Sequence, residues 1–143
     1  MKAISILGFL LMIAGILGLI ATHSLFSTNP AVIAFQAAAV ALIIWARITF
    51  GRRSFHFAAD PTKGRLVTSG PYALIRHPIY AAVCYFVVAG ALGNLPKATC
   101  GITFLVLFGT AIRIIHEERL LLQQYPEYAE YAKSTKRVVP FVF

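Results

Sequence analysis

Two polar stretches interrupt an otherwise apolar sequence, and both contain residue types that bind charged groups. The first is GPYALIRHPIYAA, residues 70–82, which places an arginine next to a histidine. The second covers residues 113–137 and opens with Arg113, followed by Glu117 and Glu118. A guanidinium group holds a carboxylate or phosphate in bidentate fashion, and a carboxylate holds an ammonium group. The two stretches therefore predict a binding site for a polar, charged molecule.

Metal and nucleophile chemistry fit these stretches less well. His116, Glu117 and Glu118 are contiguous, so their side chains point in different directions on a helix, and no second ligand pair at i, i+4 accompanies them. We therefore expect no metal site. Ser69 and His77 have no orienting partner that the sequence identifies, so a nucleophile with its base is not predicted either.

The composition places this chemistry in a membrane protein. The 143 residues are 59% hydrophobic and only 13% charged, and the mean hydropathy is +0.77. So few charges cannot cover the surface of a soluble domain of this size. The net charge of +8 comes from residues that flank apolar runs, which favours anionic headgroups over nucleic acid as the partner. Cys84 and Cys100 lie inside apolar runs and are expected to be buried free thiols.

Four apolar runs are long enough to cross a bilayer, which takes about 20 residues. Lys and Arg gather in the linker 51–77 and in the C-terminal tail, whereas the other two loops contain only Lys97. Because positively charged loops stay in the cytoplasm, both termini and the linker are predicted to be cytosolic. The sequence thus predicts a single all-α integral membrane domain over residues 1–143, with a cytosolic linker and a C-terminal interfacial helix. The predicted spans are residues 3–21, 31–50, 78–95 and 98–116.

The two last spans are joined by a short turn around Pro96, so they must form an antiparallel hairpin. Equal rise along both helices places residue 78 level with about residue 114. The two polar stretches, 70–82 and 113–137, are therefore predicted to meet at the cytosolic membrane surface.

The predicted helix ends give this site opposite polarities. Pro78 suits the first position of a helix, with His77 near the N-cap, and a helix N-terminus attracts anions. The neighbouring helix ends here with its negative pole, and Glu117 adds a carboxylate. A zwitterionic amino acid moiety matches both poles.

Each of these residues also has a purely structural explanation. Arg76 and His77 could anchor the span at the headgroups, and Arg113 and Glu117 could form only an ion pair along one helix. Arg113 lies within an apolar run, however, where a charge costs about 2.5–3.5 kcal/mol at the bilayer centre. Such placement favours a functional role.

The predicted C-terminal segment follows the last span directly. Residues 117–124 should continue its helix, and Pro126 suits the first position of a new short helix. This short helix is expected to lie against the membrane surface. Three tyrosines would line one side of it or form an interface belt, namely Tyr125, Tyr128 and Tyr131.

The composite of GRLVTSGPYALIRHPIYAA and RIIHEERLLLQQYPEYAEYAKSTKRVVP resembles the isoprenylcysteine carboxyl methyltransferase and phospholipid methyltransferase superfamily. Its members are small integral membrane enzymes that use S-adenosyl-L-methionine. The resemblance covers roughly residues 50–140, whereas the first two spans carry no signature. One departure is Ala82, which stands where the family has a small glycine.

The resemblance implies methyl transfer to a lipid or lipidated acceptor, most like that of protein-S-isoprenylcysteine O-methyltransferase. It implies catalytic roles for Arg113 and Glu118, with Arg113 also binding the acceptor. Carboxyl, amine and thiol acceptors all stay open, as does the oligomeric state. The cofactor-binding positions implied are Gly64, Arg65, Leu66, Val67, Tyr72, His77, Pro78, Ile79, Tyr80 and Glu117.

Two other functions remain in competition. Steroid and sterol reductases, which bind NADPH, have a similar Arg-His-Pro-x-Tyr stretch, but they often carry Asn between Pro and Tyr and a Glu shortly after. Here Ile79 and the apolar residues 81–83 occupy those places, which favours methyl transfer. A non-enzymatic membrane subunit or small transporter is the third alternative. The few polar residues of the first two spans make transport the weaker explanation.

The predicted topology can be tested by cysteine accessibility in a chain whose two native cysteines are replaced by alanine. A cysteine introduced at position 62 should react only with reagent on the cytosolic side, and one at position 27 only with reagent outside. The opposite pattern would overturn the predicted orientation.

Overall fold

The computed structural model describes residues 2–51, 66–94 and 97–140, and the regular secondary structure of these residues is helical. The predicted all-α class is therefore confirmed. The elements in chain order are α1 (Lys2–Ala21), α2 (Pro30–Phe50), the short 3-10 helix η2 (Gly70–Ala73), α3 (Pro78–Gly93), α4 (Lys97–Gln124) and α5 (Tyr128–Ser134).

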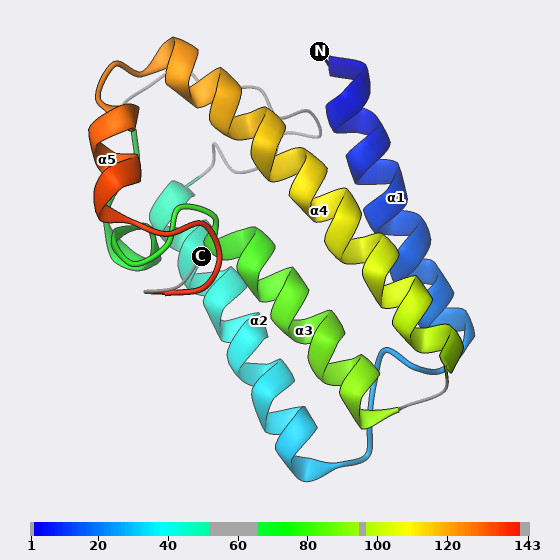
Figure 1. Cartoon of the computed structure of the whole chain (residues 1–143). Coiled ribbons are helices and arrows are strands. Elements are labelled where there is room, and N and C mark those ends of the chain that lie inside the picture. The colour runs from blue at the N-terminus through cyan, green and yellow to red at the C-terminus, as the bar shows by residue number, and fades with distance from the viewer. Residues whose placement is uncertain (1, 52–65, 95–96, 141–143) are drawn as a thin grey trace.

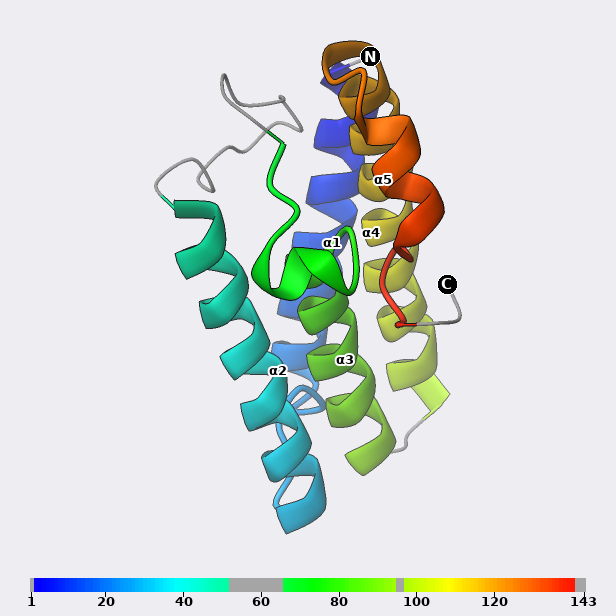
Figure 2. The same ribbon diagram turned by 90° about the vertical axis from the view of Figure 1, so that its left-hand side faces the viewer.

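The four long helices pack as two antiparallel pairs. Helix α1 lies beside α4, α2 lies beside α3, and α3 contacts α4 between the two pairs (Figure 1). The start of α1 and the end of α4 lie at the same end of the bundle, which we call the polar end. η2 and α5 also lie on the side of the bundle toward this end (Figure 2). The antiparallel α3–α4 hairpin that the sequence predicts is confirmed.

Small residues bring α1 and α4 into close contact. The buried residues of α1 recur at helical spacing, and they pack against a matching stripe on α4. The opposite face of α1 is apolar as well but points away from the protein, as a surface in contact with lipid would. Large side chains on this outer face include Ile4, Leu7, Leu10, Ile13, Leu17 and Ile20.

Within the described parts of the chain, three helices are long and apolar enough to cross a membrane, namely Ala3–Ala21, Pro30–Phe50 and Thr99–Gln124. The chain is therefore an integral membrane protein by length and composition. The remaining apolar helix, α3, has 16 residues. These rise about 24 Å, less than the roughly 30 Å of a hydrocarbon core. A membrane crossing by α3 therefore stays a prediction. It requires the polar residues at the ends of α3 to lie in the headgroup region of the membrane.

Side-chain amides lock the end of the bundle opposite the polar end. The buried Gln36 donates from Nε2 to the carbonyl oxygens of Leu25, at 2.8 Å, and Phe86, at 3.1 Å. Asn94 donates to the carbonyl of Phe26 at 2.7 Å. Gln36 and Asn94 each connect the loop after α1 to α3. These contacts fix the position of α3 along α2.

Two local expectations require correction. Cys100 is exposed on the outer face of α4, whereas Cys84 is partly buried; both are free thiols. The short helix after α4 begins at Tyr128 rather than Pro126, because the Tyr128 amide closes a turn onto the Tyr125 carbonyl at 3.0 Å. Pro126 lies within that turn. The predicted continuation of α4 through Gln124 is confirmed.

Candidate functional site

The chain after α5 returns to the start of α3. The Arg76 amide donates to the carbonyl of Lys136 at 2.7 Å, and the His77 amide donates to that of Arg137 at 3.0 Å. Ile75 and Lys136 form a parallel bridge. We call residues 135–140 the C-terminal strap, which crosses the start of α3 (Figure 1).

Glu118 joins three segments of the chain at this crossing. One of its carboxylate oxygens accepts a hydrogen bond from Arg76 Nε at 2.9 Å, and the other accepts one from Arg137 Nε at 3.0 Å. Its side chain is 12% exposed and that of Arg76 is 9% exposed. Arg76 also donates to the carbonyls of Ala132 and Thr135. Arg76 therefore acts as an internal crosslink rather than as a headgroup anchor, and Glu118 is engaged by protein groups on both oxygens.

The tyrosines of the C-terminal segment face the protein. Tyr128 is 2% exposed and Tyr125 is 9% exposed, and the Tyr131 hydroxyl donates to the carbonyl of Tyr72 at 2.6 Å. An interface belt of tyrosines, one of the alternatives that the sequence left open, is therefore wrong for this face of α5. The opposite face of α5 is exposed and carries the surface ion pair between Lys133 and Glu130.

Burial keeps these phenols neutral. It raises the pKa of Tyr131 to about 12. Burial, reinforced by the nearby Glu117 carboxylate, also raises the pKa of Tyr72. For Tyr128, burial and the charge of Glu118 raise the pKa. At neutral pH these phenols are therefore protonated.

Arg113 lies deeper, between α4, α3 and α1. It is 5% exposed, and its Nε donates to the Tyr80 hydroxyl at 3.0 Å. One of its terminal nitrogens lies 3.4 Å from the carbonyl oxygen of Ser5 on α1. The guanidinium also lies 5.1 Å from the ring centroid of Phe9 and 5.7 Å from that of Tyr80. Two aromatic rings and two hydrogen bonds thus hold the charge in place.

Tyr80 lies between this arginine and Glu117. Its hydroxyl accepts the hydrogen bond from Arg113 and lies close enough to the Glu117 carboxylate to interact with it electrostatically. Glu117 is half-buried, one turn of α4 closer to the polar end than Arg113. The predicted depth match between the two polar stretches is therefore confirmed, since residues 76–80 meet residues 113–118.

His77 contributes a buried nitrogen to the same region. It is the N-cap residue of α3, is 4% exposed, and makes no side-chain capping hydrogen bond. Its Nε2 lies 3.5 Å from a Glu118 oxygen, and no hydrogen-bond partner for it is found among the described residues. A buried, unsatisfied nitrogen at a helix N-terminus is a feature that a bound ligand would satisfy.

Most of the residues singled out by the sequence lie in this region. Pro78 is the first residue of α3 and is buried, Ile79 is half-buried beside it, and Tyr72 is 7% exposed in η2. Leu66 and Val67 lie in an irregular, half-buried segment that leads into η2. Gly64 and Arg65 lie outside the described residues.

Two groups that complete the region were not predicted from the sequence. Arg137 on the strap pairs with Glu118, and Phe9 on α1 packs on Arg113. A charged tail and one aromatic residue in an apolar span carry no pattern of their own. The only signal was the spacing of Ser5, Gly8 and Gly15, small residues that allow a second helix to approach α1.

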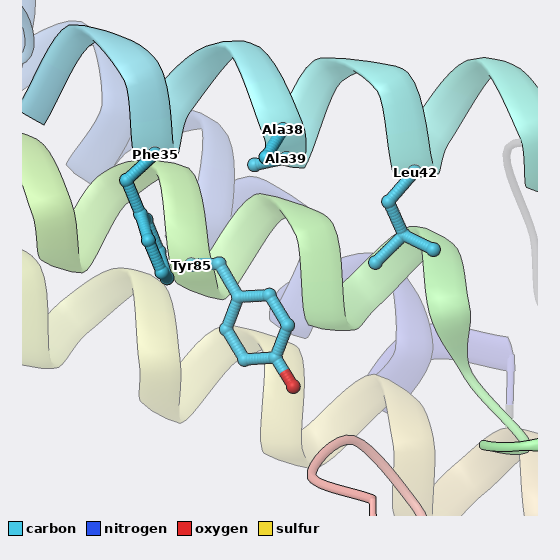
Figure 3. Close-up of a pocket in the computed structure, with 5 residues that line it drawn as sticks. All are labelled: Phe35, Ala38, Ala39, Leu42 and Tyr85. Atoms are coloured by element: carbon cyan, nitrogen blue, oxygen red, sulfur yellow. The ribbon is translucent and has the colours of Figure 1, made fainter.

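A separate apolar pocket lies between α2 and α3 (Figure 3). The Tyr85 hydroxyl at its edge donates to the Val138 carbonyl of the strap, so the strap also borders this pocket. The pocket is lined by Phe35, Ala38, Ala39, Leu42 and Tyr85.

Comparison with protein families identifies the family to which this sequence is related. The sequence model described as phospholipid methyltransferase matches residues 28–128, which is most of the chain. The chain belongs to the phospholipid methyltransferase family. The match includes α2, η2, α3, α4 and the start of α5, but not α1.

This phospholipid methyltransferase family member also resembles two curated bacterial proteins. It is 39% identical over 80 residues to the cobalt-zinc-cadmium resistance protein CzcN of Cupriavidus metallidurans, covering 52% of this chain and 35% of the relative. It is 36% identical over 80 residues to the nickel-cobalt-cadmium resistance protein NccN of Alcaligenes xylosoxydans xylosoxydans, covering 52% and 36%. The aligned part thus spans about a third of each relative. No solved structure matches the chain.

The ion-paired Glu118 generates a stability prediction. Glu118→Gln should lower the free energy of unfolding in detergent by about 3 kcal/mol or more, because two arginines lose their buried counter-charge. The strap should also loosen, so trypsin should cleave faster at Lys136 and Arg137.

Glu130→Gln is the matched control. Its carboxylate also pairs with a cation at 2.9 Å, but both side chains are largely exposed. That variant should change the stability by less than about 0.5 kcal/mol. Equal effects of the two variants would contradict a buried crosslink at Glu118.

Proposed function

We propose that this protein is an S-adenosylmethionine-dependent methyltransferase that modifies a lipid or lipidated acceptor at the cytosolic membrane surface. One observation carries the proposal: the Tyr80 hydroxyl accepts a hydrogen bond from the buried Arg113 and lies within electrostatic reach of the Glu117 carboxylate. A buried cation and a carboxylate thus lie on either side of one tyrosine, at the level where an apolar helix bundle meets the polar end. This arrangement suits a polar cofactor and a hydrophobic acceptor bound side by side.

The residues present fit the amino acid part of the cofactor. Glu117 supplies a carboxylate for its ammonium group. At the start of α3, the amides of Ile79 and Tyr80 have no acceptor within the helix, which makes them donors for its carboxylate. The buried His77 Nε2 adds a further polar group at this position. We propose that residues 64–67, Tyr72, Pro78 and Ile79 form the remainder of the cofactor site.

When bound, the cofactor supplies an electrophilic methyl group on a sulfonium. Arg113 would hold an acceptor carboxylate or phosphate, because its guanidinium offers several donors in one plane. Its position within the bundle limits water at the acceptor, and the aromatic rings fix its direction. Among the described groups, the phenols of Tyr72 and Tyr128 stay protonated, so the chain's role is to position the reactants. Glu118, proposed from the resemblance as catalytic, would act by holding the strap and α3 in place.

Two other functions compete with methyl transfer. A reductase that binds NADPH would use the same Arg-His-Pro-x-Tyr stretch, and a non-enzymatic subunit would use none of it. The relatives are named for metal resistance, but the described residues contain no group of three or more His, Cys, Asp or Glu side chains placed to hold a metal ion.

The proposal is tested with purified protein, a lipid extract of the native membrane, and S-adenosylmethionine labelled in its methyl group. A labelled lipid or lipidated product is expected, and S-adenosylhomocysteine should raise the thermal stability of the protein. Stabilisation by NADPH, with no labelled product, would identify a reductase instead.

Glu117 should determine the affinity for the cofactor. Glu117→Gln should weaken binding by about 1.5–3 kcal/mol, since a charge-assisted hydrogen bond to an ammonium group is lost. Isothermal calorimetry with S-adenosylhomocysteine measures this change, and Glu130→Gln serves as the control. An unchanged affinity with an intact fold would remove Glu117 from the site.

Arg113 should act on the acceptor instead. Arg113→Leu is expected to bind the cofactor almost normally, while methyl transfer falls by a factor of about 100 or more through lost positioning. Arg113→Lys should restore less than half of the lost free energy, because an ammonium group cannot reproduce the planar guanidinium. Loss of cofactor binding, with normal turnover of the bound fraction, would instead place Arg113 with the cofactor.

A further inference from the structure

We infer that α1 forms part of the acceptor site, because Gly8 and Phe9 set the direction of the Arg113 guanidinium. Helix α1 lies outside the residues that match the family model, so the family match does not imply this contribution. The role in acceptor recognition rests on the proposed function; the positioning of Arg113 by α1 does not.

The approach of α1 to Arg113 depends on two facing glycines. A Cβ atom on Gly8 would lie 2.9 Å from the Gly109 carbonyl oxygen and 3.2 Å from Cγ of Arg113. One on Gly109 would lie 2.6 Å from the Gly8 carbonyl oxygen. Even a methyl group would therefore push the helices apart at the level of Arg113. The absence of side chains here lets the α1 backbone serve as part of the wall around this arginine.

The close approach places two groups of α1 on the guanidinium. The Ser5 carbonyl oxygen lies 3.4 Å from a terminal nitrogen of Arg113, and the Phe9 ring centroid lies 5.1 Å from its central carbon. Ser5 is 1% exposed, so this carbonyl is shielded from water. On the other side, Tyr80 supplies its hydroxyl and its ring. Arg113 thus lies between one aromatic residue of α1 and one of α3.

This arrangement restricts the directions that the guanidinium can adopt. A long side chain in an apolar bundle would otherwise extend toward the polar end, where charge is better solvated. The Phe9 ring and the Ser5 carbonyl favour a guanidinium that stays between the helices. We therefore expect an acceptor group that binds Arg113 to approach it beside Phe9, which makes Phe9 a specificity-determining position in this proposal.

The first test observes Arg113 directly and needs no methyl transfer. In detergent micelles, the Nε–H signal of Arg113 is identified in a ¹⁵N correlation spectrum by its loss in Arg113→Lys. We expect slow exchange of this proton with water, because the group is buried and donates to Tyr80. Gly8→Ala and Phe9→Leu should shift the signal and speed its exchange at least tenfold, whereas Phe9→Tyr, which keeps the ring, should retain slow exchange.

Two α1 variants control for general damage to the helix. Gly15→Ala strains the same helix contact two turns away, since its Cβ would lie 2.5 Å from Val106 Cγ2. Leu10→Ala removes a side chain that is 56% exposed on the outer face. Both controls should leave the Arg113 signal unchanged. An equal loss in Gly15→Ala, or an unchanged signal in both Gly8→Ala and Phe9→Leu, would overturn the inference.

The second test measures acceptor recognition with the native lipid extract as the probe. In Phe9→Leu the apparent KM for the extract should rise about tenfold, in line with a lost cation–π contact, while the KM for S-adenosylmethionine changes less than twofold. Equal changes in both constants would limit α1 to a structural role. If neither the wild type nor any variant transfers methyl groups, the proposed function is wrong. The spectroscopic test of Arg113 is independent of that outcome.

Discussion

The carboxylate of Glu118 is the interaction on which the polar end of this protein depends. It receives Arg76 from the segment before α3 and Arg137 from the C-terminal strap, and it is itself carried by α4. Three segments distant in sequence therefore converge on one small group. The strap is also held by backbone hydrogen bonds from Arg76 and His77 and by the Tyr85 hydroxyl, and Glu118 adds the charged contacts. The low exposure of Glu118 and Arg76 strengthens their pairing and makes the loss of either partner costly, whereas Arg137 is more exposed.

The same requirement to neutralise charge organises the deeper part of the site. Arg113 is buried among helices that are otherwise apolar, and it is held by a hydroxyl, a backbone carbonyl and two aromatic rings. Tyr80 is central because it accepts a hydrogen bond from Arg113 and lies near the Glu117 carboxylate. The result is a short chain of polar groups from the polar end into the bundle. A polar cofactor and an acceptor from the bilayer could meet along such a chain without exposing charge to lipid.

Close packing of α1 against α4 allows Arg113 to be held deep within the bundle. The contact of Gly8 with Gly109 brings the α1 backbone against Arg113, while Gln36 and Asn94 hold α2, α3 and their loops at the opposite end. The short α3 can then present its N-terminus below the end of α4, where η2, α5 and the strap cover it. The difference in length between α3 and α4 creates the space that these segments fill.

The sequence by itself determined the helical class, the membrane setting and the meeting of residues 76–80 with residues 113–118. These follow from local properties: apolar runs of sufficient length, a turn too short for anything but a hairpin, and a constant rise per residue. Only the tertiary structure decided the partners of individual side chains. The Glu118 pairing with Arg137 and the packing of Phe9 on Arg113 join residues with no periodic relation in the chain. The direction of the tyrosines in α5 was equally undetermined, because an apolar helix face suits lipid and protein alike. Which of the two it meets depends on where the strap returns, and that is set by contacts between segments far apart in sequence.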